Sequence, residues 1–267
     1  MQLFAEYGRI IPVEYDEKEG FILKKIGKVY GVILAGGSGT RMNSPTPKQF
    51  LPLGGVPIFI HSVRALLSEP QIEELWIGSN GDWLELAQQQ IASFCSSDPR
   101  IHICEGGADR EGTLLNTLAA IRQHNTVEDD DIVLIHDAVR PFATRRIIRD
   151  VIHEMQFCDV CNTVVPVNDT IVQSADGTRI TGMPKRSELF AGQSPQGFRI
   201  NALLDAFGRL DAETRKQLTE TTMVCFKSGL PIHIVRGEFF NFKITTPYDL
   251  EVAESILDFV DRQKTDL

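Results

Sequence analysis

The sequence predicts an α/β fold: a mostly parallel, Rossmann-like sheet flanked by helices, with a projecting β-arm. Three observations support this prediction. From residue 29 onward, short apolar runs alternate with helical stretches, which is typical of a parallel sheet covered on both faces. Between residues 170 and 198 this alternation stops. There an Asp-Gly pair lies between two β-prone runs, a pattern typical of a hairpin.

The individual elements follow from apolar pattern and end signals. Val29–Leu34 is a short apolar run rich in β-branched residues, so it predicts a buried strand. Pro57 fits the first turn of a helix, and Asp82 is suited to capping the start of another. We expect further strands at 75–78, 101–104, 132–136, 163–167 and 232–235, and helices at 57–67, 82–94, 113–122, 144–155, 203–210 and 247–260.

The domain organisation is predicted to be simple. A chain of 267 residues fits one large domain with an added segment. Residues 1–28 are expected to form an N-terminal extension, to which the sequence assigns no role. Residues 29–267 form the main domain, which includes the arm at about 169–198.

Composition excludes several classes of partner. The net charge is -9, whereas nucleic-acid-binding surfaces need clustered Lys and Arg. No apolar run reaches the length of about 18 residues that a membrane span needs, and the first residues do not form a secretory signal. Five cysteines in a long chain do not favour a disulfide framework. We therefore expect a cytoplasmic protein with neither a nucleic-acid nor a membrane partner.

Cys158 and Cys161 form a single C-x-x-C pair. A zinc site needs further ligands at a suitable spacing, and none is evident in the sequence. Since the pair leads into the apolar residues Val164 and Val165, we interpret both cysteines as structural.

A glycine-rich segment follows the first expected strand. Glycines let the backbone approach a phosphate closely and direct its N–H groups toward it. Arg41 and Lys48 place two cations beside this loop, which suits a nucleoside triphosphate. The spacing differs from both the P-loop and the dinucleotide-binding motif. The simpler alternative is a glycine-rich turn with two solvated cations.

Two further charged residues lie near other predicted strand ends. Asp137 ends an apolar strand, where a carboxylate can hold a divalent cation against phosphate oxygens; the alternatives are a helix cap or a salt bridge with Arg140. Lys243 would point at phosphate if it lay near Asp137, and otherwise would be a solvent-facing lysine on an edge strand. Because ligands bind beyond the carboxyl ends of parallel strands, the glycine-rich loop and Asp137 are predicted to share one crevice.

Six motifs occur in order along the chain: Leu-x-Gly-Gly-x-Gly-Thr-Arg-Met, Pro-Lys-Gln, Asp-Ala-x-Arg-Pro, Asn-Asp-Thr-Ile, Arg-x-x-Leu-x-x-x-x-Ser-Pro-Gln-x-Phe and Lys-Ile-Thr-x-Pro-x-Asp-Leu. From about Val29 to Ile256 the sequence thereby resembles the sugar-alcohol phosphate cytidylyltransferases, whose fold is a GT-A-like nucleotidyltransferase fold. The resemblance implies an enzyme that transfers CMP from CTP to a polyol phosphate and releases pyrophosphate.

The resemblance also implies roles for individual residues. Arg41 and Lys48 match the catalytic cations, and Asp137 matches the acidic residue near Mg²⁺ and the polyol. The residues that match polyol-phosphate ligands are Asp137, Thr170, Arg186 and Lys243. The residues that match nucleotide ligands are Leu34, Ala35, Gly36, Gly37, Ser38, Gly39, Thr40, Gly107, Ala108, Arg110 and Thr113. In the family the arm reaches a neighbouring protomer, which implies a homodimer. His136 is expected to pack or orient rather than to catalyse, because a phosphate monoester is already a charged nucleophile.

The identity of the polyol is predicted from residues that differ between the two branches of the family. Phe240, where the methylerythritol branch often has Asp, resembles the ribitol branch, and so does the segment 191–196. We therefore expect D-ribitol 5-phosphate, with a product, CDP-ribitol, that suits teichoic-acid synthesis. The alternatives are 2-C-methyl-D-erythritol 4-phosphate in isoprenoid precursor synthesis, a UTP- or GTP-dependent sugar nucleotidyltransferase, and a non-catalytic nucleotide-binding protein. The segment 219–222 departs from the family pattern, so contacts there stay open.

Overall fold

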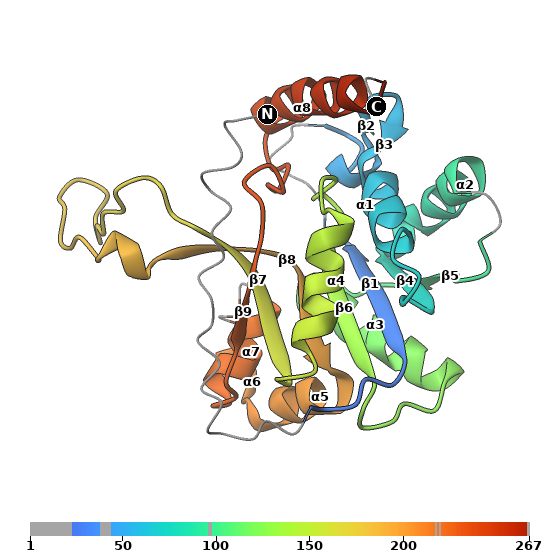
Figure 1. The fold of residues 1–267 in the computed structure, drawn as a ribbon, viewed down its shortest axis with the longest axis horizontal. Helices are drawn as coiled ribbons and strands as arrows, with labels where there is room; N and C mark the ends of the chain where they lie inside the picture. The colour runs from blue at the N-terminus through green and yellow to red at the C-terminus, as the bar shows by residue number, and fades with distance from the viewer. Residues whose placement is uncertain (1–22, 38–43, 96–97, 217, 219, 266–267) are drawn as a thin grey trace.

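A seven-stranded sheet forms the centre of the molecule (Figure 1). The computed structural model describes residues 23–37, 44–95, 98–216, 218 and 220–265. In sheet order the strands are β5 (Ile101–Glu105), β4 (Glu74–Ser79), β1 (Val29–Ala35), β6 (Ile132–Asp137), β8 (Phe190–Arg199), β7 (Val160–Pro166) and β9 (His233–Arg236). Strand β8 runs antiparallel to both neighbours, whereas the other adjacent pairs are parallel. The prediction of a mostly parallel sheet is confirmed.

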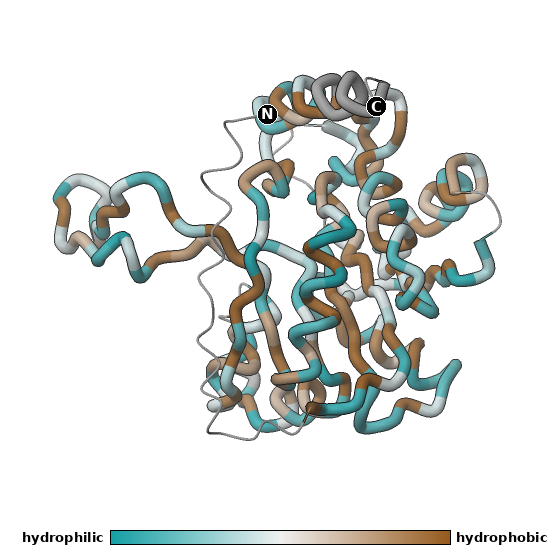
Figure 2. Tube along the Cα trace, in the orientation of Figure 1, coloured by the Kyte–Doolittle hydropathy of each residue, from teal (hydrophilic) through white to brown (hydrophobic). Residues whose placement is uncertain are grey.

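Helices cover both faces of this sheet. One apolar cluster joins the sheet to α1 (Ile58–Leu67), α2 (Leu84–Phe94) and α4 (Arg145–Glu154). A second cluster joins the opposite face to α3 (Arg110–His124), α5 (Ile200–Arg209) and α7 (Thr221–Lys227). All seven residues of β1 are buried, because a strand in the middle of a doubly covered sheet has no solvent-facing side. Figure 2 shows hydrophobic residues along the strands between the helical layers.

A third apolar cluster fixes a smaller layer beyond the carboxyl ends of the strands. There α8 (Pro247–Thr265) packs beside a short hairpin of β2 (Pro52–Leu53) and β3 (Val56–Pro57). Its buried members are Leu53, Ile58, Val139, Ile244 and Ala253. The cluster includes Ile244, so it holds in place the loop that also carries Lys243.

The expected strands and helices form, with shifted ends, and one expected cap is wrong. A short 3-10 helix, η3 (Gly81–Trp83), precedes α2, and the side chain of Asn80 accepts a hydrogen bond from the backbone N–H of Asp82. Asn80, not Asp82, therefore caps this segment. The helix expected at 113–122 begins earlier, at Arg110, because Asp109 caps it by accepting from the backbone N–H of Gly112.

The sequence pattern did not predict β8, α7 or the short α6 (Ala212–Lys216). Residues 190–198, assigned to the arm, belong to β8, and the projecting part lies between β7 and β8 (Figure 1). Within it, the expected hairpin reduces to one bridge between Gln173 and Gly182, with Gly177 at a φ of 71°. None of the described helices is both long and apolar enough to cross a lipid bilayer. Residues 1–22 of the predicted extension lie outside the described residues.

Candidate active site

Asp137 ends β6 and is surrounded by three cationic side chains. Its Oδ2 lies 3.2 Å from Lys243 Nζ and 3.2 Å from Arg140 Nε, and its Oδ1 lies 3.6 Å from Arg110 Nη2. Burial acts to raise the pKa of the Asp137 carboxyl, but the charges of Lys243, Arg110 and Arg140 outweigh it and hold that pKa well below its usual value. The carboxylate is thus ionised at neutral pH, and an excess of positive charge surrounds it.

Lys243 lies in the loop between β9 and α8, not on an edge strand. The backbone N–H of Ile244 donates to the carbonyl of Val139 at 2.9 Å. Arg140 donates through Nη1 to the carbonyl of Asn241 at 2.9 Å. These bonds join the loop to the segment that follows Asp137. Lys243 is therefore not an edge-strand lysine, and it lies near Asp137, which is the condition on which its expected role depends.

Lys48 is distant from Lys243 in the sequence but lies in the same region of the structure. It lies in a 3-10 turn, η2 (Lys48–Phe50), and its Nζ donates to the carbonyl of Ile244 at 2.8 Å. The next residue, Gln49, donates through Nε2 to the carbonyls of Ala35 at 2.7 Å and Gly37 at 2.8 Å. Gln49 thereby ties this turn to the start of the glycine-rich loop. The described start of the glycine-rich loop, Lys48 and the Lys243 loop thus meet at the carboxyl ends of β1 and β6. This agrees with the predicted placement of the glycine-rich loop beside Asp137.

Part of the predicted loop is not described. Ser38, Gly39, Thr40 and Arg41 lie outside the described residues, so their nucleotide-binding and catalytic roles stay predictions. Gly36 is described, and a Cβ there would collide with the Thr113 hydroxyl. A glycine at this position lets the end of β1 approach the start of α3.

The predicted nucleotide segment at 107–113 forms a tight turn between β5 and α3. The Thr113 hydroxyl is buried, donates to the carbonyl of Asp109 at 2.7 Å and accepts from the N–H of Gly107 at 3.2 Å. It therefore shapes this turn, and Ala108 is exposed within it. Arg110 donates to the Thr221 hydroxyl at 2.7 Å and also faces Asp137. Of this group, Arg110 is the residue that reaches the Asp137 cluster.

Thr170 and Arg186 are exposed on the projecting arm. Arg186 donates to the carbonyl of Asn168, on the arm itself, at 3.0 Å. Both residues belong to the segment between β7 and β8, which Figure 1 shows projecting away from the sheet.

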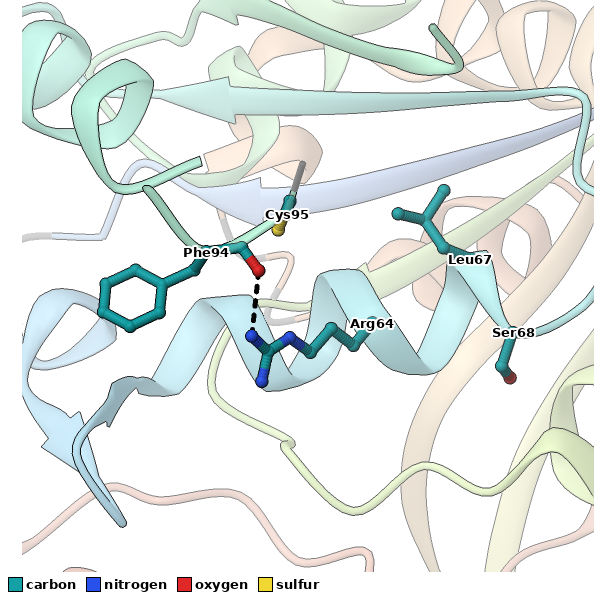
Figure 3. Close-up of a pocket in the computed structure, with 5 residues that line it drawn as sticks. All are labelled: Arg64, Leu67, Ser68, Phe94 and Cys95. Carbon is teal, nitrogen blue, oxygen red and sulfur yellow. Dashed lines mark hydrogen bonds between the residues drawn. The ribbon is translucent and has the colours of Figure 1, made fainter. Parts of the chain in front are cut away.

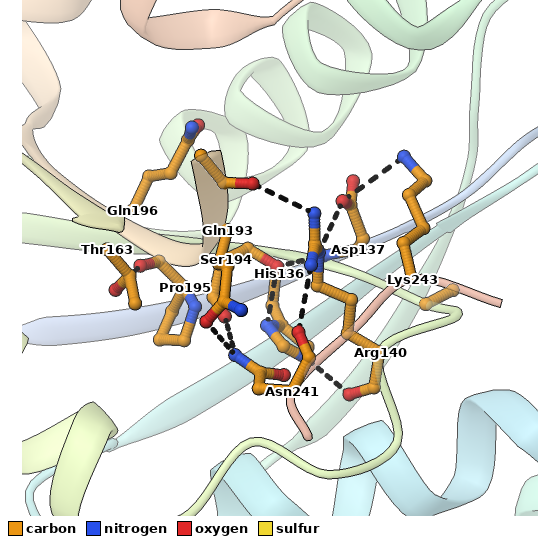
Figure 4. Close-up of polar contacts among 12 residues, drawn as sticks. His136, Asp137, Arg140, Thr163, Gln193, Ser194, Pro195, Gln196, Asn241 and Lys243 are labelled. Carbon is orange, nitrogen blue, oxygen red and sulfur yellow. Dashed lines mark hydrogen bonds and ion pairs between the residues drawn. The ribbon is translucent and has the colours of Figure 1, made fainter. Parts of the chain in front are cut away.

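A buried polar network supports Asp137 from β8 (Figure 4). His136 Nε2 lies 3.0 Å from the carbonyl of Arg140, and its Nδ1 lies 2.9 Å from the Ser194 hydroxyl. A carbonyl only accepts, so Nε2 carries the proton and Nδ1 accepts from Ser194. Ser194 in turn accepts from the backbone N–H of Asp137 at 3.1 Å. Burial lowers the pKa of His136 to about 4, so the ring is neutral at pH 7, and through Ser194 it is linked to the backbone N–H of Asp137.

Sequence reasoning missed Ser194, Gln193 and Asn241 as parts of this network. Asn241 donates through Nδ2 to the carbonyl of Ser194 at 2.9 Å, and Gln193 donates to the carbonyl of Glu238 at 2.9 Å. All three are buried. Their occurrence in the Ser-Pro-Gln motif and just before Lys243 was the available signal.

A separate hollow of about 360 Å³ lies between α1 and α2 (Figure 3). Its lining residues are Arg64, Leu67, Ser68, Phe94 and Cys95. Arg64 Nη2 donates across it to the carbonyl of Phe94 at 2.8 Å. The hollow shares no residue with the Asp137 cluster.

The fold and this site define a nucleotidyltransferase: the described start of a glycine-rich loop, a buried lysine and a carboxylate surrounded by cations meet at the carboxyl ends of strands in a mostly parallel sheet. Residues 29–259 match the model of the family "IspD: 2-C-methyl-D-erythritol 4-phosphate cytidylyltransferase". The chain belongs to this family of cytidylyltransferases.

Two kinds of relative support this membership. The chain is 42% identical over 231 residues to "Ribitol-5-phosphate cytidylyltransferase" of Lactiplantibacillus plantarum, covering 86% of this chain and 98% of the relative. Among solved structures, 2-C-methyl-D-erythritol 4-phosphate cytidylyltransferase from Thermus thermophilus is 25% identical with a TM-score of 0.65, covering 86% of this chain and 98% of that one. The 4-diphosphocytidyl-2C-methyl-D-erythritol synthase from Anaerococcus prevotii shares the fold at 21% identity and a TM-score of 0.71, covering 88% of this chain and 99% of that one.

Proposed function

We propose that the protein transfers CMP from CTP to D-ribitol 5-phosphate, giving CDP-ribitol and pyrophosphate. The observation that carries this proposal is the 42% identity, over almost the whole of the relative, to a protein named ribitol-5-phosphate cytidylyltransferase. The similar solved methylerythritol enzymes are 21–25% identical. Phe240 and the segment 191–196 favour the same branch.

The geometry around Asp137 supports binding of phosphate. Lys243 and Arg110 are about one third exposed, at 35% and 32%, whereas Arg140 is 11% exposed. An incoming phosphate can therefore reach Lys243 and Arg110 while Arg140 keeps its contacts with Asp137 and the backbone. The cations are held in place by the carboxylate before the substrate arrives, which lowers the reorganisation that binding requires.

In the proposed reaction, a phosphate oxygen of ribitol 5-phosphate attacks the α-phosphorus of CTP in line with the leaving group. A new P–O bond forms, the bond to the β-phosphate oxygen breaks, and pyrophosphate leaves with that electron pair. No general base is needed, because the attacking phosphate is already ionised near neutral pH. Lys48 and Arg41 would stabilise the charge that develops on the transferred phosphoryl group and on pyrophosphate.

Asp137 suits a Mg²⁺ site that uses one protein carboxylate together with substrate phosphates, which is a common arrangement for this ion. Its carboxylate is ionised and 13% exposed at the site. When bound, Mg²⁺ would supply charge neutralisation for the triphosphate.

The arm supports a homodimer as part of the proposal. It presents large apolar side chains to solvent, with exposed fractions of 46% for Val172, 60% for Ile180 and 65% for Met183. Exposed apolar patches of this kind mark interaction surfaces. In a dimer the arm would carry Thr170 and Arg186 to the partner's site, completing its polyol-phosphate contacts. The proposed setting is the cytoplasm, with CDP-ribitol supplied to a teichoic acid or a similar polymer.

A nucleotide panel tests the proposal. The purified protein is incubated with Mg²⁺, ribitol 5-phosphate and each of CTP, UTP, GTP and ATP, and pyrophosphate release is followed while mass spectrometry identifies the product. We expect CDP-ribitol from CTP and little release with the other three. Turnover with UTP or GTP equal to that with CTP would contradict the assignment of the base.

The second candidate substrate is 2-C-methyl-D-erythritol 4-phosphate, which the name of the matching family favours. Its phosphate would meet the same Lys243 and Arg110. Asp137→Asn serves as the control in both assays, because loss of the carboxylate removes the group that arranges the cations. Pyrophosphate release that is as fast with this variant as with the parent would indicate a contaminating enzyme.

A further inference from the structure

Glu154, Cys158 and His233 bring three donor atoms together outside the candidate active site. Glu154 ends α4, Cys158 lies in the loop before β7, and His233 begins β9. The carboxylate oxygen, the sulfur and the ring nitrogen all lie within 4.8 Å of one another. The Glu154 Oε1 and His233 Nδ1 atoms are already 2.6 Å apart.

A fourth donor lies beside them. Cys161 and His233 are directly paired in the parallel register of β7 and β9, so their side chains share one face of the sheet. The thiol of Cys161 donates to the carbonyl of Val151 at 3.8 Å and lies 3.7 Å from the Met155 sulfur. The neighbouring Cys158 thiol and burial raise the pKa of Cys161 well above its usual value. Neither cysteine forms a disulfide.

The sequence alone gave no second pair of ligands for the C-x-x-C motif. The fold supplies one: α4 and β9 bring Glu154 and His233 to Cys158 from 4 and 75 positions away in the sequence. Sulfur, imidazole and carboxylate donors are the combination that zinc accepts in proteins. In a tetrahedral site with bonds of about 2.0–2.3 Å, donors lie roughly 3.3–3.8 Å apart. The donor atoms of Glu154, Cys158 and His233, which lie within 4.8 Å of one another, would need to shift by about 1 Å to reach that spacing.

The exposure of the four residues suits entry of an ion. Cys158 and Cys161 are buried, at 4% and 0%, whereas the side chains of His233 and Glu154 are 40% and 28% exposed. The thiols therefore form the protected floor of the cluster, and the imidazole and carboxylate form its solvent side.

The cluster lies at the amino ends of the parallel strands, whereas Asp137 lies at their carboxyl ends. Strands β7 and β9 are parallel to β6, because β8 is antiparallel to both β6 and β7. Asp137 is the last residue of β6, whereas His233 is the first residue of β9 and Cys161 is the second of β7. An ion here would not contact the substrates.

We propose that Glu154, Cys158, Cys161 and His233 form a binding site for Zn²⁺ with a structural role. The ion would link the end of α4 to the amino ends of β7 and β9. The same connection between α4 and β7 holds the start of the described chain, since the carbonyl of Gln156 accepts from the N–H of Lys24 at 2.8 Å. A metal at this place would therefore stabilise both the edge strand β9 and the connection that holds Lys24.

The test is a zinc titration of the full-length, untagged protein against a chromophoric chelator, in excess Mg²⁺ to occupy the Asp137 site. We expect one Zn²⁺ per chain, with protons released as the thiols ionise. Both His233→Ala and Cys158→Ser should weaken binding by at least about 100-fold, since loss of outer partners alone costs 10–100-fold. Cys95→Ser, which removes a thiol outside the cluster, is the matched control and should bind like the parent.

Two further readouts keep the proposal falsifiable. Co²⁺ added in place of zinc should give a thiolate-to-metal charge-transfer band in the parent and in Cys95→Ser, and a much weaker band at the same Co²⁺ concentration in Cys158→Ser. Zinc should also raise the thermal midpoint of the parent and leave that of His233→Ala, whose side chain is 40% exposed, unchanged. No zinc bound by the parent, or equal affinity in the parent and both cluster variants, would overturn the proposal. Neither readout depends on the cytidylyltransferase activity.

Discussion

The ammonium group of Lys48 donates a 2.8 Å hydrogen bond to the backbone carbonyl of Ile244, 196 residues further along the chain. Ile244 is the neighbour of Lys243, which pairs with Asp137. This bond joins a turn near the glycine-rich loop to the loop that carries a phosphate-binding candidate. The two segments predicted to bind CTP and the polyol phosphate are thereby held at one place.

Replacement of Lys48 by alanine is expected to lower turnover by about 10² to 10³-fold, because a placed electrostatic donor is lost. The bond to Ile244 is lost as well, which should lower stability by about 1 kcal/mol. Steady-state kinetics of pyrophosphate release and a urea melt measure the two effects. Lys25→Ala removes an 82% exposed lysine and should change neither. Near-parental turnover in Lys48→Ala would show that Lys48 is not catalytic.

Lys243→Ala should act mainly on the polyol phosphate. A hydrogen bond to a charged group contributes about 1.5–3 kcal/mol, so kcat/KM for ribitol 5-phosphate should fall by roughly 10 to 100-fold. The KM for CTP should change much less. Kinetics with each substrate varied in turn distinguish these effects. An equal loss for both substrates would place Lys243 at the triphosphate instead.

Acid should destabilise the protein through His136. Its folded-state pKa of about 4 lies below the ordinary value of 6.5, so the folded state binds fewer protons than the unfolded state. The stability this neutral ring provides is complete above pH 6.5 and falls as the pH drops toward 4. Between pH 7 and pH 5 the free energy of unfolding should decrease by about 2 kcal/mol from this group.

Urea melts at pH 7 and pH 5, in EDTA, measure this change. His136→Gln keeps a polar side chain but removes the titration, so its decrease over the same range should be smaller by about 2 kcal/mol. Equal decreases in parent and variant would mean that His136 is not buried in its neutral form. The lowered pKa of Asp137 acts in the same direction but only below about pH 4.

The arm gives a prediction about assembly. Met183→Asp puts a charge on the exposed apolar surface of the arm and should shift a dimer toward monomer in sedimentation velocity. Arg186→Ala leaves that surface intact, so it should stay dimeric but show a raised KM for ribitol 5-phosphate. A Met183→Asp protein with unchanged mass and unchanged kinetics would count against the arm model.

Much of the fold was predictable because its signals are local. β1 and β6 are continuous apolar runs, as expected for strands buried on both faces. β8 was not, since its sequence contains glycine, proline and glutamine where apolar alternation would be expected. Its place in the sheet depends on pairing with β6 and β7, which a local pattern does not encode.

The residues of the candidate site also divide into those that the sequence predicts and those that depend on the three-dimensional fold. Asp137, Lys48 and Lys243 could be predicted because each lies in a motif with chemical meaning. The buried partners Ser194 and Asn241 could not, because a polar residue in a loop or strand shows its hydrogen bonds only in three dimensions. The grouping of Cys158 with His233 also depends on the pairing of β7 with β9.

The ratio of kcat/KM for ribitol 5-phosphate to that for 2-C-methyl-D-erythritol 4-phosphate, measured with CTP and Mg²⁺, tests the central claim most directly. Both polyol phosphates offer the same phosphate to Lys243, so a difference reports recognition of the polyol itself. The account predicts a ratio above about 100, the range that lost hydrogen bonds to substrate hydroxyls produce. A ratio below one would contradict the ribitol assignment and place the protein with the methylerythritol enzymes.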